Sequence, residues 1–361
     1  MARGMACFGW FALEWQYFWI RVIHHMHKNE LCFGLQPQIF SVSINLLSDE
    51  LVSFRIRPSW SNFCGFILME ANALNAKTPY QKKPEWLKVK IENPRNLSKV
   101  NTIIQSLNLN TVCHGANCPN RLECFSKRTA TFMILGSVCS RHCRFCNIES
   151  GKLLPPDIGE PYRVAEAVKQ LDLKHAVITS VTRDDLEDGG AFLFAETIKA
   201  IKSTSPDTVI EVLIPDFKGN EAALNLVMDA GPAIINHNVE TVIRLYESVR
   251  PEADYAQSLE LLKRVKAYNP KILSKSGFML GLGENEEEIY KLIDDLKAVS
   301  VDILTIGQYL PPSDQHAPLV AYIHPDAFTT YGKYAQSIGI GSVASSPLVR
   351  SSYNAHEVSG L

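Results

Sequence analysis

The sequence lacks a strong net charge, an internal repeat and a low-complexity tract. Its 36 lysines and arginines against 38 aspartates and glutamates leave a formal net charge of −2. No overall electrostatic attraction to nucleic acid or to an anionic membrane is therefore expected, which disfavours a zinc-finger-like nucleic-acid binder. With 361 residues, 46% of them hydrophobic, the chain is long enough for one barrel domain with extensions or for two smaller domains.

The first 68 residues lack a clear hydrophobic period and the marks of a targeting segment. The aromatic-rich run from Phe8 to Ile20 is too short for a membrane span and is interrupted by Glu14 and Gln16. It has no small-residue cleavage site of a secretory signal, and the first thirty residues are poor in the Arg and Ser of a mitochondrial transit peptide. We expect the natural chain to begin at Met69 and to be cytoplasmic, with a mitochondrial location as the alternative if residues 1–68 are a targeting extension.

Cysteine is distributed unevenly along the chain. Six of the nine cysteines lie in two triplets, which suits a reducing compartment, because extracellular disulfide scaffolds are usually much shorter chains. The first triplet is Cys113, Cys118 and Cys124, with gaps of four and five residues. The second is Cys139-Ser-Arg-His-Cys143-Arg-Phe-Cys146, which follows the apolar run Thr131-Phe-Met-Ile-Leu-Gly136.

Each triplet is one cysteine short of a complete cubane site. Three thiolates hold three corners of a [4Fe–4S] cluster and leave one iron open to another ligand. A structural zinc site is the alternative, but zinc usually takes four protein ligands with symmetric two-residue spacings. A two-cluster electron carrier is a second alternative, but it would be served by complete sets of four cysteines. Two incomplete sets therefore favour two clusters that take part in chemistry.

The gaps of three and two residues in the second triplet are similar to those of the radical S-adenosylmethionine (SAM) enzymes. With the first triplet, the segment from Thr129 to Gly136 and the motif Arg350-Ser-Ser-Tyr353, the chain resembles the lipoyl synthase family from about Lys83 to Ala355. Biotin synthases and methylthiotransferases also insert sulfur, but neither family combines the first triplet, with its gaps of four and five residues, with a terminal Arg-Ser-Ser-Tyr motif. The resemblance implies insertion of two sulfur atoms, at carbons 6 and 8 of an octanoyl group on a lysine of a lipoyl carrier domain.

The resemblance also implies the cofactors and their ligands. Two [4Fe–4S] clusters and SAM are expected, with the second triplet holding the cluster that cleaves SAM and the first holding an auxiliary cluster that gives up its sulfur. The fourth ligand of the auxiliary cluster would be Ser352, or alternatively Ser351. Arg350 would hold that serine or the substrate amide in place.

The expected partners follow from the same resemblance. They are the octanoylated lipoyl carrier domains of the 2-oxoacid dehydrogenase complexes and the glycine cleavage H protein, a reductant such as ferredoxin or flavodoxin, and an iron–sulfur carrier that rebuilds the auxiliary cluster. Neither nucleic acid nor a membrane is expected as a partner.

From Thr129 onward, short apolar runs alternate with helical patterns, which indicates parallel strands joined by helices. Six strands are expected, at Thr131–Leu135, Ala176–Thr179, Val209–Ile214, Ile234–Asn236, Gly277–Leu280 and Ile303–Ile306. The pattern predicts an α/β fold, a partial (β/α)6 TIM-type barrel with N- and C-terminal extensions. We place the N-terminal extension at 69–128, the barrel at 129–312 and the C-terminal extension, with a further helix at Pro325–Ile338, at 313–361.

Polar clusters follow the expected strands, and barrel chemistry gathers at the carboxyl ends of strands. Eight of these residues are expected to contact SAM, and some of them the substrate: Arg183, Asp184, Gly189, Gly190, Asn238, Glu240, Gly281 and Gly283. Structural explanations remain open for several of them. Glycine pairs are often only turns, the charges at 183–185 are compatible with a solvated loop, and Gly281–Glu284 is compatible with the start of a helix.

Overall fold

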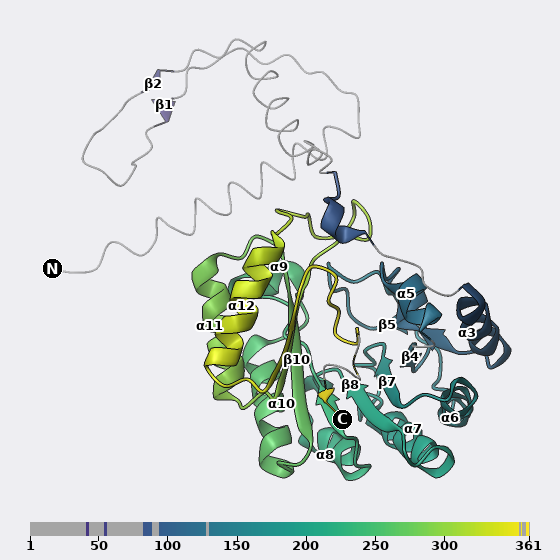
Figure 1. The fold of residues 1–361 in the computed structure, drawn as a ribbon. Coiled ribbons are helices and arrows are strands. Elements are labelled where there is room, and N and C mark those ends of the chain that lie inside the picture. The colour runs from purple at the N-terminus through teal and green to yellow at the C-terminus, as the bar shows by residue number, and fades with distance from the viewer. Residues whose placement is uncertain are drawn as a thin grey trace, which may run out of the picture. The chain divides into compact units, whose positions relative to one another are not determined.

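A computed structural model gives the fold of the chain (Figure 1). It describes residues 41–42, 54–55, 82–88, 94–127, 130–353, 355 and 359–360. The chain divides into two units, residues 1–79 and 80–361. In the first unit, β1 (Ser41–Val42) pairs antiparallel with β2 (Phe54–Arg55). The expected start at Met69 lies outside the described residues, as does most of the segment 1–68.

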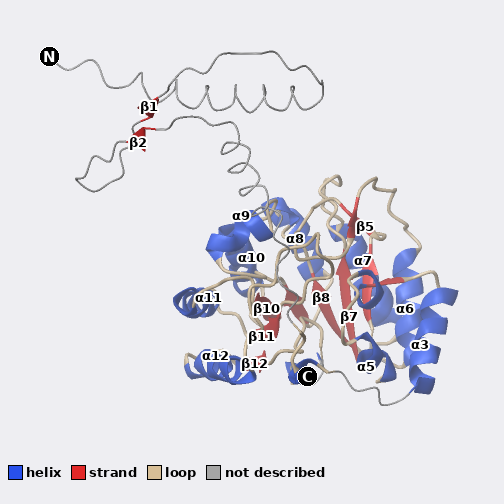
Figure 2. Ribbon diagram, turned by 90° about the horizontal axis from the view of Figure 1, so that it is seen from above, coloured by secondary structure: helices blue, strands red, loops and turns tan. Residues whose placement is uncertain are grey.

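An eight-stranded sheet forms the centre of the second unit, with helices packed around it (Figure 2). Its order is β12-β11-β10-β9-β8-β7-β4-β3. The six central strands pair in parallel with one another. They are β4 (Thr131–Ile134), β7 (His175–Ser180), β8 (Val209–Leu213), β9 (Ile234–Asn236), β10 (Leu273–Leu280) and β11 (Ile303–Gln308). The predicted six-stranded partial barrel is confirmed.

The two edge strands were not predicted. At one edge β12 (Ser342–Ser345) pairs parallel with β11, and at the other β3 (Asn110–Thr111) pairs antiparallel with β4. Both are too short to show a period in the sequence. The C-terminal extension therefore adds a strand to the sheet before the chain continues into the motif Arg350-Ser-Ser-Tyr353.

Helices connect the parallel strands as the sequence predicts. They are α6 (Glu160–Leu171), α7 (Ala191–Thr204), α8 (Glu221–Asp229), α10 (Tyr255–Tyr268) and α11 (Glu286–Ala298), with α12 (Pro325–Ser337) before β12. Side chains of Asn220, Asp254 and Asn285 accept hydrogen bonds from the first turns of α8, α10 and α11, and Glu288 completes a capping box with Asn285. These bonds satisfy amides that a helix start leaves unpaired.

Shorter elements carry the two cysteine triplets. Helices α3 (Pro94–Ser106), α4 (Val112–Gly115) and α5 (Arg121–Ser126) precede β4. After β4, β5 (Val138–Cys139) pairs with β6 (Glu149–Ser150) and closes the base of the loop that holds the second triplet. The remaining elements are α9 (Tyr246–Val249) and the 3-10 turns η1 (Glu85–Leu87), η2 (Phe217–Gly219) and η3 (Ile243–Leu245). In the described part of the chain, no helix is long and apolar enough to span a membrane.

Gly190 has a packing role at the start of α7. Its φ is +89°, and a Cβ there would lie 2.3 Å from Cδ1 of the buried Leu135. Gly136 has a similar φ of +95°, but a Cβ there would meet nothing within 4 Å. A comparison of alanine variants at the two glycines therefore separates the cost of the left-handed backbone from the cost of overpacking.

We expect Gly190→Ala to destabilise the fold more than Gly136→Ala does. The left-handed backbone costs an alanine about 1–2 kcal/mol at either position, and overpacking adds about 1–3 kcal/mol at Gly190 alone. Denaturant unfolding of the two variants measures the difference. Equal losses would show that Leu135 moves aside freely.

Candidate active site

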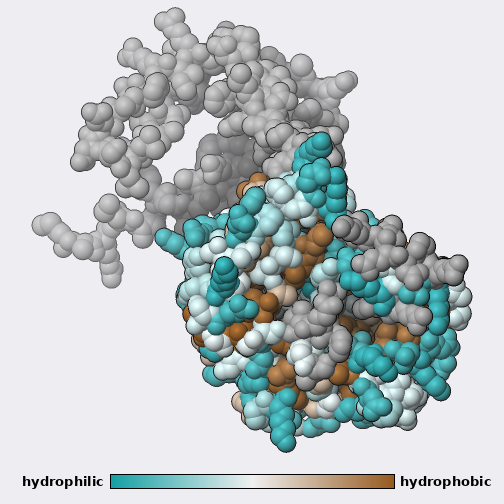
Figure 3. Space-filling model, in the orientation of Figure 1, coloured by the Kyte–Doolittle hydropathy of each residue, from teal (hydrophilic) through white to brown (hydrophobic). Residues whose placement is uncertain are grey.

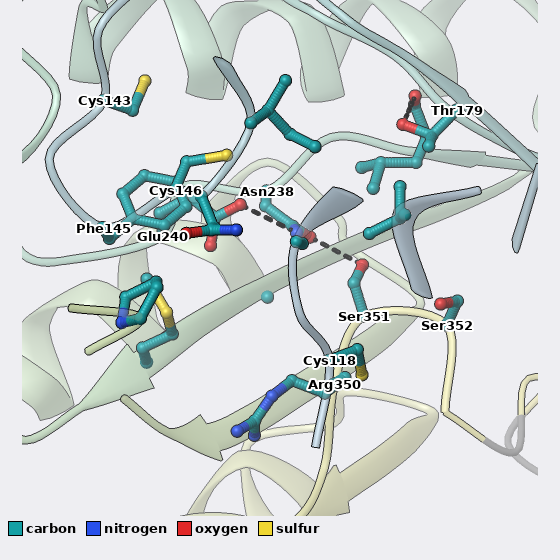
Figure 4. Close-up of a pocket in the computed structure, with 18 of the residues that line it drawn as sticks. Cys118, Cys143, Phe145, Cys146, Thr179, Asn238, Glu240, Arg350, Ser351 and Ser352 are labelled. Carbon is teal, nitrogen blue, oxygen red and sulfur yellow. Dashed lines mark hydrogen bonds between the residues drawn. The ribbon is translucent and has the colours of Figure 1, made fainter. Parts of the chain in front are cut away.

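Both cysteine triplets line one cavity of about 710 Å³. The second triplet follows β4, whereas the first precedes it, and Ala130, Thr131 and Met133 of the β4 region also line the cavity. The cavity therefore runs along β4 from one cysteine triplet to the other. All six cysteines are free thiols. Figure 4 shows Cys143 and Cys146 in one part of the cavity and Cys118, next to Arg350, in another.

Local hydrogen bonds set the geometry of the first triplet. Thr111 caps α4 by accepting from the backbone of His114, which places Cys113 in the first turn of the helix. The ring of His114 bonds to Thr111 and packs against Phe125. Burial raises the pKa of Cys113 to about 11 and that of Cys124 to about 12. Binding a metal cluster at these thiols therefore releases protons.

Arg141 fixes the loop of the second triplet. It lies between Cys139 and Cys143, and its guanidinium forms ion pairs with Asp184 and Asp216 at 2.7 and 2.6 Å. Burial alone would raise the pKa of Asp216, but the hydrogen bonds from Arg141 lower it to about 2. The cysteine loop is thereby tied to the segments that follow β7 and β8. Sequence reasoning missed Arg141, because an arginine inside a cysteine motif carries no pairing signal of its own.

The cysteines of the second triplet lie in a polar, half-buried setting. The backbone of Thr182 donates to Cys139 Sγ at 3.3 Å. Burial raises the pKa of Cys143 to about 11, while the positive charge of Arg250 acts in the opposite direction. Arg250 is itself buried and lines the cavity. It was also missed, since its position after α9 brings it near the cysteines only in three dimensions.

Two of the residues expected to contact SAM, Asn238 and Glu240, line the cavity. Asn238 Nδ2 donates to Glu240 Oε1 at 3.0 Å. Arg250 Nη1 donates to the carbonyl oxygens of Asn238 and Val239, at 3.1 and 3.0 Å. Burial raises the pKa of Glu240, and the charge of Arg250 opposes this shift. A carboxylate, an amide and a guanidinium thus lie together near the second triplet.

The other six expected SAM contacts are not among the residues that line the cavity. Arg183 pairs with Asp185, and Asp184 pairs with Arg141. A Cβ at Gly189 would lie 2.9 Å from the ring of Phe217, and Gly190 packs against Leu135. Each has a structural partner, and a contact with SAM stays a prediction for all four.

Gly281 and Gly283 form the turn between β10 and α11. Their φ angles are +106° and +107°, and a Cβ at Gly281 would lie 2.4 Å from Gln308 Nε2. Glu284 accepts from the backbone amides of Gly281 and Leu282. These contacts agree with the alternative explanation that residues 281–284 only form the turn at the start of a helix. SAM binding by the two glycines stays a prediction.

The motif Arg350-Ser-Ser-Tyr353 lies inside the cavity with the first triplet. Thr131 Oγ1 donates to Ser352 Oγ at 2.7 Å, and Tyr353 donates to Glu123, which precedes Cys124, at 2.8 Å. Asn120 Nδ2 donates to the carbonyl of Leu348 at 2.6 Å. The C-terminal segment is therefore bound to the helices and loop that carry the first triplet.

Comparisons with known proteins show which sequences this chain resembles. The family described as "Radical SAM superfamily" matches residues 133–296. The lipoyl synthase of Alkaliphilus metalliredigens is 59% identical over 277 residues, which cover 77% of this chain and 96% of that protein. The lipoyl synthase of Caldanaerobacter subterraneus subsp. tengcongensis is 54% identical over 274 residues, with 76% and 96% covered.

Solved structures with a similar chain path include methylornithine synthase, with a TM-score of 0.47, 12% identity and coverage of 70% of this chain and 72% of that one. Another is HydG, a maturase of the [FeFe]-hydrogenase, with a TM-score of 0.48, 14% identity and coverage of 78% and 62%.

The buried ring of His237 makes the stability of the fold depend on pH. Burial and the charge of Arg250 lower its pKa from 6.5 to about 4. The folded state therefore binds this proton more weakly than the unfolded chain, so stability is complete above about pH 6.5 and falls toward pH 4, by about 3 kcal/mol in all. We expect His237→Gln to remove most of this dependence in the metal-free chain.

The measurement is the free energy of unfolding by denaturant at about pH 7 and about pH 5, where the difference due to His237 is about 2 kcal/mol. His324→Gln, at an exposed ring, is the control and should leave the difference unchanged. An unaltered pH dependence in His237→Gln would assign it to other groups.

Proposed function

Because the chain belongs to the lipoyl synthase family of radical SAM enzymes, we propose that its two cysteine triplets divide the family's reaction between them. The reaction inserts two sulfur atoms, at carbons 6 and 8 of an octanoyl group on a lysine of a lipoyl carrier domain. The observation that supports this division is that both incomplete triplets line one cavity. A substrate carbon can therefore reach both sites without leaving the protein.

The donor atoms fit the cofactors of the family. Each triplet offers three free thiols, and soft thiolate sulfur is the usual ligand of iron–sulfur clusters. Two [4Fe–4S] clusters and SAM, when bound, supply an electron, a carbon radical that removes hydrogen from an unactivated methylene, and the sulfur. The task of the chain is to hold these groups, to orient the acyl group and to limit access of water.

Cys139, Cys143 and Cys146 would hold the SAM-cleaving cluster. The pairing of Arg141 with Asp184 and Asp216 keeps their loop in place. Asn238 and Glu240 present an amide and a carboxylate on the same part of the cavity surface and would orient polar groups of SAM. Both are held in position by the hydrogen bond between their side chains, and Arg250 holds the backbone of Asn238.

Cys113, Cys118 and Cys124 would hold the auxiliary cluster, with Ser352 as its fourth ligand. A hydroxyl oxygen binds iron less strongly than a thiolate would, so this ligand is the one that is most easily released. Ser352 is held by Thr131, whose backbone also bonds to Cys113. Arg350 lies beside Cys118 in the cavity (Figure 4) and would orient the serine or the substrate amide.

The proposed partners are the octanoylated carrier domains of the 2-oxoacid dehydrogenase complexes and the glycine cleavage H protein. A reductant such as ferredoxin or flavodoxin and an iron–sulfur carrier would complete the cycle in the cytoplasm. Among the described residues, the sheet ends at β12 on one side and at β3 on the other, and a partial barrel of this kind leaves a side through which an acyl-lysine arm can enter. Figure 3 shows that hydrophobic and polar residues are interspersed over the visible face of this unit.

We expect the reconstituted protein to hold two [4Fe–4S] clusters and the variant with Cys139, Cys143 and Cys146 all changed to Ala to hold one. Iron and sulfide analysis with Mössbauer spectroscopy counts the clusters. The triple variant should form no 5′-deoxyadenosine from SAM under strong reductant. Formation of this product by the triple variant would contradict the assignment of the second triplet.

We expect Ser352→Cys to retain SAM cleavage but to lose most sulfur insertion, because a thiolate completes the auxiliary cluster with a stronger ligand. The assay is an anaerobic single turnover on an octanoyl-lysine peptide, with 5′-deoxyadenosine and thiolated products followed by mass spectrometry. Ser337→Cys, at an exposed residue at the end of α12, is the matched control. Full sulfur insertion by Ser352→Cys would remove the proposed role of Ser352, and absence of thiolated product with the unaltered protein would refute the function.

A further inference from the structure

A charged pair lies buried in the interior of the barrel, outside the residues that line the cavity. Lys275 Nζ on β10 lies 2.8 and 3.1 Å from the two carboxylate oxygens of Glu211 on β8. Both side chains are buried, with 1% and 0% of their surface exposed. His175 on β7 contacts the same carboxylate at 3.2 Å. The interior of such a barrel is usually filled by branched aliphatic side chains, so this charged pair calls for an explanation.

Stability does not provide that explanation. Removing two charges from water is costly, and replacing a buried pair with apolar side chains of similar size is often neutral or stabilising. A buried ion pair is therefore better explained by what it orients than by the free energy it contributes.

Glu211 orients the side chain of Asn236. Its Oε1 accepts from Asn236 Nδ2 at 3.1 Å, and a carboxylate only accepts hydrogen bonds. The negative charge therefore fixes the amide with its NH₂ group toward Glu211. Asn236 is 0% exposed, so its amide has no water with which to exchange this bond. Within the described residues, its Oδ1 has no hydrogen-bond partner, which shows that the orientation is set on the NH₂ side.

The oriented amide in turn determines which hydrogen bonds the hydroxyl of Ser351 accepts and donates. Asn236 Nδ2 donates its second hydrogen bond to Ser351 Oγ at 2.7 Å. Ser351 Oγ then donates its own proton to Asn238 Oδ1 at 3.1 Å, as Figure 4 shows. The hydroxyl of Ser351 is thus engaged both as an acceptor and as a donor. The adjacent Ser352 makes a different contact, with Thr131 on β4.

We propose that Glu211, Lys275 and Asn236 form a positioning network that holds Ser351 and thereby presents Ser352, and not Ser351, to the first cysteine triplet. The inference rests on the proposed function of that triplet. It assigns unlike roles to the two serines of the motif: Ser351 anchors the segment to β9, and Ser352 faces the cysteines. Glu211, Lys275 and Asn236 do not line the cavity, and the hydrogen bond from Asn236 to Ser351 connects them to its surface.

The test is the double variant Glu211→Leu with Lys275→Met, which replaces the ion pair with apolar side chains. In the reconstituted full chain, we expect amide hydrogen exchange across residues 346–353 to be about tenfold faster or more, and sulfur insertion on an octanoyl-lysine peptide to fall by about tenfold, as for lost supports of metal ligands. The Mössbauer spectrum of the auxiliary cluster should also change. SAM cleavage should be retained.

A rescue variant and a control separate positioning from general packing. Glu211→Gln with Lys275→Met keeps a neutral oxygen that accepts from Asn236, so it should restore most of the slow exchange and the original spectrum. Thr197→Val, at a 0% exposed residue that bonds only within α7, should change neither. If the apolar double variant does not fold, Asn236→Ala leaves the ion pair in place and should give the same faster exchange.

Unchanged exchange, spectrum and sulfur insertion in the apolar double variant, or in Asn236→Ala, would overturn the proposal. Loss without rescue by the glutamine variant would also overturn it, because a packing defect would then be sufficient. Hydrogen exchange and the spectrum do not depend on turnover. If the unaltered protein forms no thiolated product, the proposed function fails, while these two measurements still decide whether the network positions the segment.

Discussion

The candidate site depends on one constraint, which is that the sheet does not close into a barrel. Its edges are β12 and β3, and the segment after β12 bridges the two sides of the opening. On one side, Ser346 N donates to Ile306 O and Gln308 N to Pro347 O. On the other side, Ser352 accepts from Thr131. A closed barrel would fill its interior with side chains, whereas this one takes in a segment of backbone whose two serines line the same cavity as the cysteines.

Close approach of this segment requires a residue without a side chain on β11. A Cβ at Gly307 would lie 2.1 Å from the carbonyl oxygen of Val349 and 3.3 Å from Arg350 Nη1. No side chain fits at that distance, and the obstacle is backbone, which cannot rotate away. The φ angle of Gly307 is not in the positive range that favours glycine. The fold therefore requires glycine at this position because it is small, not because its backbone is flexible. The same strand thus supports the sheet and admits the motif.

The sequence predicted the regular part of this arrangement, and it pointed to the cysteine triplets and the C-terminal motif that line one cavity. Most residues of the six parallel strands are buried and apolar, and the cysteines and the motif Arg350-Ser-Ser-Tyr353 are local patterns. The first half of β10 was missed, because its buried residues at 274–276 are Ser, Lys and Ser and not an apolar run. The contacts that place them are not local. Arg141 pairs with Asp216 across 75 residues, and Asn120 bonds to Leu348 across 228. Such pairs have no signal in a single sequence, because each partner is an ordinary polar residue until the fold brings it near the other.

Electrostatics links the two ends of the cavity. A guanidinium group lies near each triplet: the buried Arg250 near Cys143, and the half-buried Arg350 near Cys118. Burial of a positive charge is costly unless a negative charge lies close to it, and burial lowers the pKa of Arg350 while the neighbouring Cys118 opposes this shift. Burial equally disfavours ionisation of the thiols at Cys113 and Cys146. The arginines and the cysteines are therefore each poorly solvated alone and are stabilised together when the sulfur atoms become negative. This mutual dependence couples the charge state of the cavity to the ligands that it binds.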